Sequence, residues 1–293
     1  MRLLGVTCLV MLAFAGNGLL TRAGVTVGGL MPMEFAVVRL FSGALTLALL
    51  CLVLRGALRL GGGRGRLVGV VALLIYLIGY SLAYTDIDAG IGALIVFGMV
   101  QITMFAGGLV VREAMPVNRW VGAGLAFAGL IWLLWPAGAV AVSLWHGALM
   151  AVAGIGWGLY SLAGRQERDA LQGTAGNFIL AALGVLAVVL MLGGGGFLRD
   201  VAGAEPLGLW LALGSGVVTS AMGYALWYTV LPRLPGTVAA TAQLTVPVIT
   251  MAGGMIWLGE ALTLRFGLAS VLVLGGVALS VRPQRGRSRS SGS

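Results

Sequence analysis

Aromatic side chains at helical spacing are the strongest chemical signal in this sequence. Tyr76, Tyr80 and Tyr84 follow one another at intervals of four residues, which places them on one face of a helix. A tyrosine hydroxyl that is buried in hydrocarbon needs a hydrogen-bond partner, so such a face either packs against polar groups or lines a cavity. Aromatic residues gather at helical spacing in two further places: Trp157 with Tyr160, and Tyr224 with Trp227 and Tyr228.

These rings have two possible roles, which depend on their place along the helix. Near the ends of the apolar runs, at Tyr84 and Tyr228, we expect packing or a place in the belt of rings at a membrane interface. For Tyr80, Trp157 and Tyr224, cavity lining and packing are both open. We centre a candidate substrate site on these three rings. The neighbouring rings that complete it are Tyr76, Tyr160 and Trp227.

Polar groups inside apolar runs are the second signal. Asn17, Gln101 and Gln243 each lie within such a run. They could form hydrogen bonds between helices, worth about 0.6 kcal/mol each on average, or bind the ammonium and carboxylate groups of an amino acid. Arg39 lies roughly a turn and a half inside its predicted helix. Its side chain could extend to the interface, pair with Glu34, or hold a substrate carboxylate.

Pro247 is a proline well inside a predicted span. It removes a backbone donor and frees a carbonyl nearby. Broken helices often mark a binding site or a hinge in transporters. We expect a hinge at Pro247, with a static kink as the alternative.

Several kinds of chemistry have no residues to support them. No Asp or Glu falls in the middle of a predicted span, which argues against a proton relay of carboxylates and against a cationic substrate. All 18 basic residues are arginine, which excludes lysine Schiff-base chemistry. His146 is predicted at a helix end, and Cys8 and Cys51 lie in apolar runs as packing residues. We therefore expect no enzyme, no metal and no cofactor.

The composition requires a lipid environment. Hydrophobic residues make up 59% of the chain, charged residues 9%, and the mean hydropathy is +1.04. A soluble domain has about 25% charged residues, so this chain cannot cover a water-facing surface. The net charge of +9 does not indicate a nucleic-acid partner, because the arginines are scattered between apolar runs.

The apolar runs are long enough to cross a bilayer, which takes about 20 residues per helix. Arg2 and the run after it resemble a signal peptide, but the repeat described next needs this segment as a retained helix. The predicted spans are 3–21, 32–54, 67–85, 89–111, 118–135, 146–164, 173–192, 208–231, 236–258 and 264–281.

The two halves of the chain are predicted to be copies of one module. The turn Gly259–Glu260–Ala261 aligns with Arg112–Glu113–Ala114, and the same shift superposes Trp227 on Tyr80. Each half then holds five helices, an odd number, so the second copy enters the membrane from the opposite side. We expect an all-α integral membrane protein of ten transmembrane helices in two inverted repeats, with residues 1–135 and 136–281 as the repeats and 282–293 as a basic disordered tail.

The arginines predict the orientation. With the N-terminus in the cytoplasm, 14 of the 18 arginines fall on the cytoplasmic side, as the positive-inside rule requires. Both termini are then cytoplasmic. Six tryptophans also lie near span ends, where amphipathic rings favour the interface: Trp120, Trp132, Trp135, Trp145, Trp210 and Trp257.

The chain resembles the drug/metabolite transporter superfamily in its ten-helix EamA-type branch. The residues that carry the resemblance are the two Glu-Ala turns, each leading into a glycine-rich final helix, and three further features: Trp157–Gly158–Leu159–Tyr160, Pro247 and Arg39. The resemblance implies a secondary transporter, and its nearest branch exports aromatic and other neutral amino acids. The small multidrug members carry a membrane glutamate in their first helix, where this chain has Asn17 within a neutral stretch.

The sequence therefore predicts a transporter in a bacterial inner membrane that exports small neutral or zwitterionic metabolites, amino acids above all, by alternating access. An apolar pocket with a few polar groups suits such substrates. Two alternatives stay open: an exporter of drugs or nucleotide precursors, and a membrane enzyme acting on lipid-linked substrates. We expect a monomer or weak homodimer whose partners are a small-molecule substrate and the lipid bilayer.

Overall fold

The computed structural model describes most of the chain, and all structural statements concern these residues: 2–61, 63–110, 117–135, 143–164, 167, 169–191, 195–230, 233, 242–243 and 245–280. Three predicted features lie outside them: the turn at 112–114, the residues 236–241 of the ninth predicted span, and the tail 282–293.

Every regular element in the described part of the chain is a helix. In a bilayer this is expected, because a helix satisfies its backbone hydrogen bonds within one segment. The helices are α1 (Arg2–Thr26), α2 (Pro32–Arg55), α3 (Gly63–Ala83), α4 (Ala89–Val110), α5 (Val117–Leu134), α6 (Leu144–Gly164), α7 (Ala170–Met191), α8 (Gly195–Ala202), α9 (Pro206–Gly214), η1 (Ser215–Met222), α10 (Gly223–Val230), α12 (Thr245–Trp257) and α13 (Leu264–Ser280).

Local sequence sets the bounds of α2 clearly. Pro32 occupies the first turn, where its missing N–H costs nothing, and the carboxylate of Glu34 accepts a hydrogen bond from the Met31 N–H at 3.0 Å. The helix ends at Gly56, whose φ of 67° is left-handed and whose N–H donates to the Leu52 carbonyl. The predicted span 32–54 is confirmed within two residues.

The helices have the length and composition of membrane spans. Among the described residues, seven helices are long and apolar enough to cross a bilayer, and three more are shorter and apolar: 120–133, 245–257 and 264–279. Large apolar side chains also cover the outer surface, as with Val53 and Ile256, which are exposed. Such a surface is stable against lipid and not against water. The protein is therefore an all-helical, multi-pass membrane protein.

The eighth predicted span contains a feature that its hydropathy does not reveal. Residues 206–230 form one long helical segment, but its middle, η1, is a π-helix between α9 and α10. The short helix α8 precedes this segment and lies between two predicted spans, so the sequence did not predict it. π-helical turns are rare and occur mostly at functional sites, so η1 directs attention to the residues around it.

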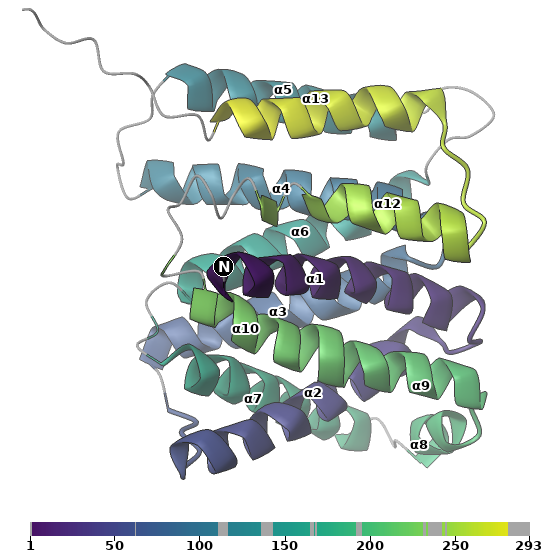
Figure 1. Cartoon of the computed structure of the whole chain (residues 1–293). Helices are drawn as coiled ribbons and strands as arrows, with labels where there is room; N and C mark the ends of the chain where they lie inside the picture. The colour runs from purple at the N-terminus through teal and green to yellow at the C-terminus, as the bar shows by residue number, and fades with distance from the viewer. Residues whose placement is uncertain are drawn as a thin grey trace, which may run out of the picture.

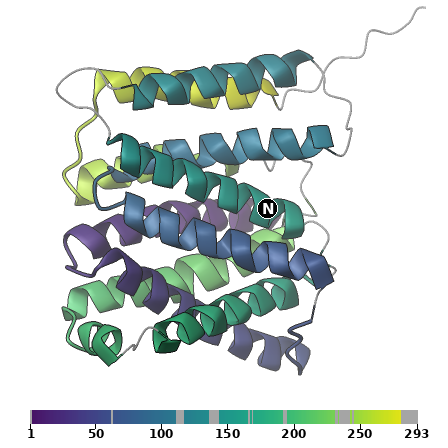
Figure 2. The same cartoon turned by 180° about the vertical axis from the view of Figure 1, so that it is seen from behind.

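The helices lie side by side, and most of them run back and forth across the same thickness (Figure 1). α3 packs along α6, α2 packs against α7 and η1, and α1 contacts α9, η1, α10 and α12. α5 and α13 pack on each other as a pair at one edge of the molecule, which is visible from both sides (Figures 1 and 2). The main buried core is continuous and takes residues from α1, α2, α3, α4, α6, α7 and the η1–α10 segment, with further residues from α5, α12 and α13.

Tryptophan exposure divides as the sequence predicts. The six tryptophans near span ends are all exposed by more than half of their side chains: Trp120, Trp132, Trp135, Trp145, Trp210 and Trp257. Trp157 and Trp227 are instead 4% and 3% exposed. The first group suits a membrane interface, and the second belongs to the interior.

Candidate functional site

The tyrosines of α3 form a continuous ladder in the interior. Because they are four residues apart, their rings lie next to one another along one face. The centroids are 5.0 Å apart for Tyr76 and Tyr80, which are tilted, and 4.7 Å apart for Tyr80 and Tyr84, which meet edge to face. Tyr84 is fully buried and its hydroxyl donates to the Ala89 carbonyl at 3.3 Å. The belt role predicted for Tyr84 is therefore wrong, and the packing role is confirmed.

Trp157 of α6 connects this ladder to the η1–α10 segment. Its ring lies 5.0 Å from Tyr76 and 4.6 Å from Tyr224, measured between centroids. Tyr160 stacks on Trp157 at 5.5 Å from the next turn of the same helix. Helices that are far apart in sequence thus bring Trp157 and Tyr224 into contact, and Tyr76 connects Tyr80 to them.

Further rings complete what we call the aromatic cluster. Phe14 of α1 meets Trp157, Tyr224 and Trp227 edge-on, with each centroid distance between 5.8 and 5.9 Å. The aromatic cluster is defined as Phe14, Tyr76, Tyr80, Tyr84, Trp157, Tyr160, Tyr224, Trp227 and Tyr228.

Three members of the cluster are not among the predicted site residues: Phe14, Tyr84 and Tyr228. Phe14 lies three residues before Asn17, on the same face of α1, and that spacing is the signal that could have identified it. Tyr228 is 8% exposed, so the belt role predicted for it is also wrong.

Arg39 is buried among the rings of the aromatic cluster. It is 0% exposed, and its Nε donates to Ser220 Oγ at 2.9 Å. Its Nη2 donates to the hydroxyls of Tyr224 at 3.0 Å and Tyr76 at 3.3 Å. The guanidinium carbon also lies 5.3 Å from the Tyr76 ring centroid and 5.5 Å from that of Tyr80, a cation–π geometry.

This position excludes two of the roles considered for Arg39. The side chain does not reach the interface, and it does not pair with Glu34, whose carboxylate binds the Met31 N–H. Nη1 of Arg39 has no hydrogen-bond partner, and no carboxylate among the described residues lies within ion-pair distance. Binding a substrate carboxylate is the one role still open.

Asn17 is the polar centre of the contact between α1 and η1. Its Oδ1 accepts hydrogen bonds from Ser215 at 2.7 Å and Thr219 at 3.1 Å, and its Nδ2 donates to Tyr76 at 3.2 Å. Its amide is therefore used in interhelical hydrogen bonds, the first of its two predicted roles. Because Tyr76 also accepts from Arg39, Asn17 orients a hydroxyl that faces the arginine.

The π-helical segment η1 supplies the hydroxyls of this network. A π-helix pairs residues five apart, and Ser215 and Ser220 are five apart, directed to Asn17 and Arg39 respectively. Gly216 permits the close approach of η1 to α2, because a Cβ there would lie 2.5 Å from the Arg39 carbonyl oxygen. The sequence reasoning missed these residues, since small hydroxyls in an apolar run give little signal.

Three predicted site residues do not join this network. Gln101 and Gln243 are half-buried, and neither takes part in the hydrogen bonds around Arg39 and Asn17. Pro247 is buried in the first turn of α12 as the structure describes it, where a proline is accommodated without a kink. The hinge at Pro247 stays a prediction, because residues 236–241 and 244 of the same predicted span lie outside the described part of the chain. Among the described residues, the segment 206–230 changes its helix geometry at η1.

Ionic contacts hold the helices together at the end of the bundle where α1 finishes. Arg22 donates to the Tyr84 carbonyl at 2.7 Å and lies 3.4 Å from Asp88 and 3.6 Å from Glu260. Glu260, in the connection between α12 and α13, also accepts from the Ala89 N–H at 2.7 Å. Burial raises the pKa of Glu260 above its usual value.

A second group of polar contacts lies at the opposite end, where α3 begins. Arg66 pairs with Glu167 at 3.3 Å, donates to Asn177 Oδ1 at 3.0 Å and binds the Gly173 carbonyl. Arg55 pairs with Asp169 at 2.8 Å, which holds the pKa of that carboxyl below its usual value. Polar contacts therefore join helices of the first half to those of the second at both ends of the aromatic cluster.

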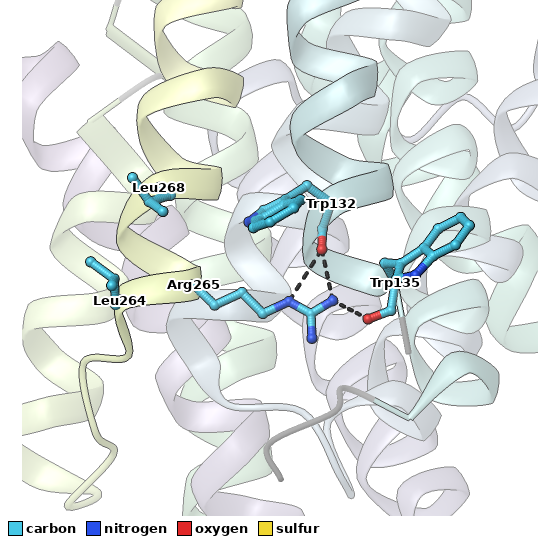
Figure 3. A pocket seen from close by; sticks show the side chains of 5 residues that line it. All are labelled: Trp132, Trp135, Leu264, Arg265 and Leu268. Atoms are coloured by element: carbon cyan, nitrogen blue, oxygen red, sulfur yellow. Dashed lines mark hydrogen bonds between the residues drawn. The ribbon is translucent and has the colours of Figure 1, made fainter. Parts of the chain in front are cut away.

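A pocket of about 350 Å³ lies away from this cluster, between the end of α5 and the start of α13 (Figure 3). Leu264, Leu268, Trp132 and Trp135 line it with apolar surface. Its charged residue, Arg265, donates to the backbone carbonyls of Trp132 and Trp135, which stabilises the C-terminus of α5. We therefore assign this pocket to the lipid-facing surface and not to the candidate site.

Metal binding has no support in the described part of the chain. No group of three His, Cys, Asp or Glu side chains there lies close enough to hold a metal ion. The polar chemistry of the candidate site consists of one guanidinium, one amide and several hydroxyls, which can bind an anion or a polar head group.

Comparison with known proteins identifies the relatives of this chain. The pattern of the EamA-like transporter family matches residues 144–282. An uncharacterized protein of Pseudomonas aeruginosa is 43% identical over 291 residues, which cover 99% of this chain and 98% of that protein. A crystal structure of a protein shares the fold with a TM-score of 0.63 at 18% identity, over 96% of this chain and 97% of the other.

Proposed function

Because the chain belongs to the EamA-like transporter family, we propose that it is a secondary transporter that exports neutral or zwitterionic amino acids, aromatic ones included, across the bacterial inner membrane. The observation that carries this proposal is the aromatic cluster with Arg39 at its centre. Its rings suit an apolar side chain, and the arginine and hydroxyls suit a polar head group.

Two inverted repeats, residues 1–135 and 136–281, would place this site between equivalent helices. Helix packing supports the repeat. In the repeat, α1 corresponds to α6, α3 to the segment from α9 to α10, and α4 to α12. α3 and α4 pack on α6, and their counterparts in the second half pack on α1. Each contact therefore recurs between the corresponding helices of the other half. Substrate sites of such transporters lie at the interface of the repeats.

Alternating access then requires the two ends of the site to open in turn. The contacts of Glu260 with Arg22 and Ala89 would break when one side opens. The contacts of Arg66 with Glu167 and Asn177 would break when the other opens. The contacts of Glu260 and Arg22 are partly exposed and contribute about 1 kcal/mol each. Arg66 is buried, so its contacts cost more free energy to break, and we expect opening on that side to be the harder step.

We propose that both termini face the cytoplasm, because 14 of the 18 arginines then lie on that side. A cysteine introduced at Gly61, where a Cβ meets no atom within 4 Å, reports this orientation in a variant lacking Cys8 and Cys51. We expect an impermeant reagent added from outside the cell to leave it unlabelled. Labelling from that side would overturn the orientation.

A second candidate within transport is the export of drugs or nucleotide precursors. Flat aromatic molecules could also stack on the faces of Trp157 and Tyr224. A nucleotide would bring a phosphate dianion, however, and Arg39 is the one cation in the cluster. We therefore favour amino acids.

Counterflow in proteoliposomes tests the proposed function. Vesicles preloaded with unlabelled phenylalanine, leucine, a purine nucleoside or a cationic drug are diluted into the labelled compound. We expect uptake above that of protein-free vesicles for the neutral amino acids and not for the cationic drug. Uptake of the nucleoside or drug alone would replace the amino-acid assignment, and no uptake of any compound would contradict the transport proposal.

A further inference from the structure

Arg39 differs from the arginines at the two ends of the core in the charges that surround it. Arg22, Arg55 and Arg66 each lie within 3.6 Å of a carboxylate. Arg39 is more deeply buried than any of these, yet its partners are neutral hydroxyls and ring faces. A buried charge without a counter-ion is expensive and usually functional in a membrane protein.

The hydrogen bonds of Arg39 leave the N–H donors on one edge of its guanidinium without a partner. The group has five N–H donors in a planar fork. Nε and Nη2 direct three of them at Ser220, Tyr224 and Tyr76. Nη1 has no hydrogen-bond partner although it is buried. Nη1 and Nη2 form the pair that binds the two oxygens of a carboxylate side by side, and the contact to Tyr76, at 3.3 Å, is the longest of the three.

We infer that Arg39 binds the carboxylate of the substrate, so that the transported molecules are monocarboxylates whose apolar part packs on Trp157 and Tyr224. The inference rests on the proposed function and makes its substrate class narrower. In it, the carboxylate bonds to Nη1 and Nη2 and takes the place of the Tyr76 hydroxyl on Nη2. The incoming anion supplies the counter-charge that Arg39 lacks among the described residues.

The single positive charge of Arg39 favours a carboxylate over a phosphate as the bound group. A phosphate monoester carries about 1.5 to 2 negative charges at pH 7, and one guanidinium would leave part of that charge buried without compensation. The other deeply buried arginine of the described chain, Arg66, is already paired with Glu167. The site is therefore matched to a head group with one negative charge, such as the carboxylate of an amino acid.

The contacts of Arg39 also connect substrate binding to both halves of the chain. Tyr76 belongs to α3 in the first half, whereas Ser220 and Tyr224 belong to the η1–α10 segment in the second. The bonds of Arg39 to Ser220 and Tyr224 join the two halves. The bond to Tyr76, which the carboxylate replaces, lies within the first half. Arg39 is thus placed to respond to substrate at the interface where the two halves must move.

Ligand pairs that differ only in the carboxyl group test the inference without altering the protein. Binding of phenylalanine, its carboxamide and the corresponding amine that lacks the carboxyl group is measured on the purified wild-type protein by tryptophan fluorescence. Hydrogen bonds to charged groups contribute about 1.5–3 kcal/mol, so we expect the carboxylate to bind roughly 10- to 100-fold more tightly than the amide. Equal affinities for acid and amide would overturn the inference, as would a preference for phenyl phosphate.

Variants of Arg39 provide the second arm. Arg39→Gln should abolish the preference for acid over amide, and Arg39→Lys, which keeps the charge and loses the planar fork, should retain part of it. Arg199→Gln, at an exposed arginine on α8, is the matched control and should keep the wild-type preference. If Arg39→Gln does not fold, the lysine variant and the ligand pairs still decide the question.

The outcomes separate this inference from the proposed function. Carboxylate-dependent binding that is lost in the Arg39 variants, with no counterflow in vesicles, would support the inference and contradict transport. Counterflow of amino acids with equal binding of acid and amide would support transport and overturn the inference.

Discussion

Two regions of this protein combine an arginine with tryptophan rings, and they differ in almost every other respect. In the aromatic cluster, Arg39 is 0% exposed and Trp157 is 4% exposed. In the α5–α13 pair, Trp132 and Trp135 are 51% and 62% exposed and Arg265 lies near the surface. Both regions have the residue types of a binding site.

The partners of the two arginines explain the difference. Arg265 donates to backbone carbonyls at the end of α5, groups that need a partner at any helix C-terminus. Arg39 donates to hydroxyls from three separate elements, and its Nη1 is left over. Residue type alone therefore does not identify a site here. Burial combined with incomplete hydrogen bonding does.

Matched glycines provide the largest predicted difference between the two regions. At Gly216 of η1 a Cβ would lie 2.5 Å from the Arg39 carbonyl oxygen, whereas at Gly275 of α13 it would meet no atom within 4 Å. We expect Gly216→Ala to destabilise the fold by about 3 kcal/mol through overpacking. Gly275→Ala should be neutral or stabilising by up to about 1 kcal/mol, because alanine favours a helix.

Thermal unfolding of both variants in detergent, followed by tryptophan fluorescence, measures this difference. Gly124→Ala on α5, also in open space, controls for a general effect of alanine in the peripheral pair. Equal unfolding temperatures for Gly216→Ala and Gly275→Ala would mean that η1 and α2 are not packed closely around Arg39.

The fold could be predicted from the sequence far better than the site. Apolar runs bounded by glycine, proline and charge marked the helices within a few residues, as at α4 and α6. Hydropathy is a property of each segment by itself. It carries no information about a π-helix such as η1, or about the close packing of its Gly216 against α2.

The partners within the site depend on which faces meet, and that limited the prediction. The four-residue spacing of Tyr76, Tyr80 and Tyr84 correctly indicated one face. Nothing in the spacing indicated that this face would meet Arg39 of α2 and Trp157 of α6. Gln101 and Gln243 lie in apolar runs as Asn17 does, so the sequence does not distinguish the three amides. In the structure, neither glutamine takes part in the hydrogen bonds of Asn17.

The central claim is that substrate binds to the buried aromatic cluster. The most direct test compares the affinities of the Trp157→Ala and Trp132→Ala variants for phenylalanine. Both variants remove the same indole, one from the buried cluster and one from the exposed surface of the α5–α13 pair. We expect Trp157→Ala, like Tyr224→Ala, to weaken binding by about 2 kcal/mol, or roughly 30-fold, through loss of a buried ring. Trp132→Ala should bind as the wild type does, and Trp157→Leu should lose less affinity for leucine than for phenylalanine. Normal affinity in Trp157→Ala and Tyr224→Ala, with both variants folded, would show that these rings only pack and that substrate binds elsewhere.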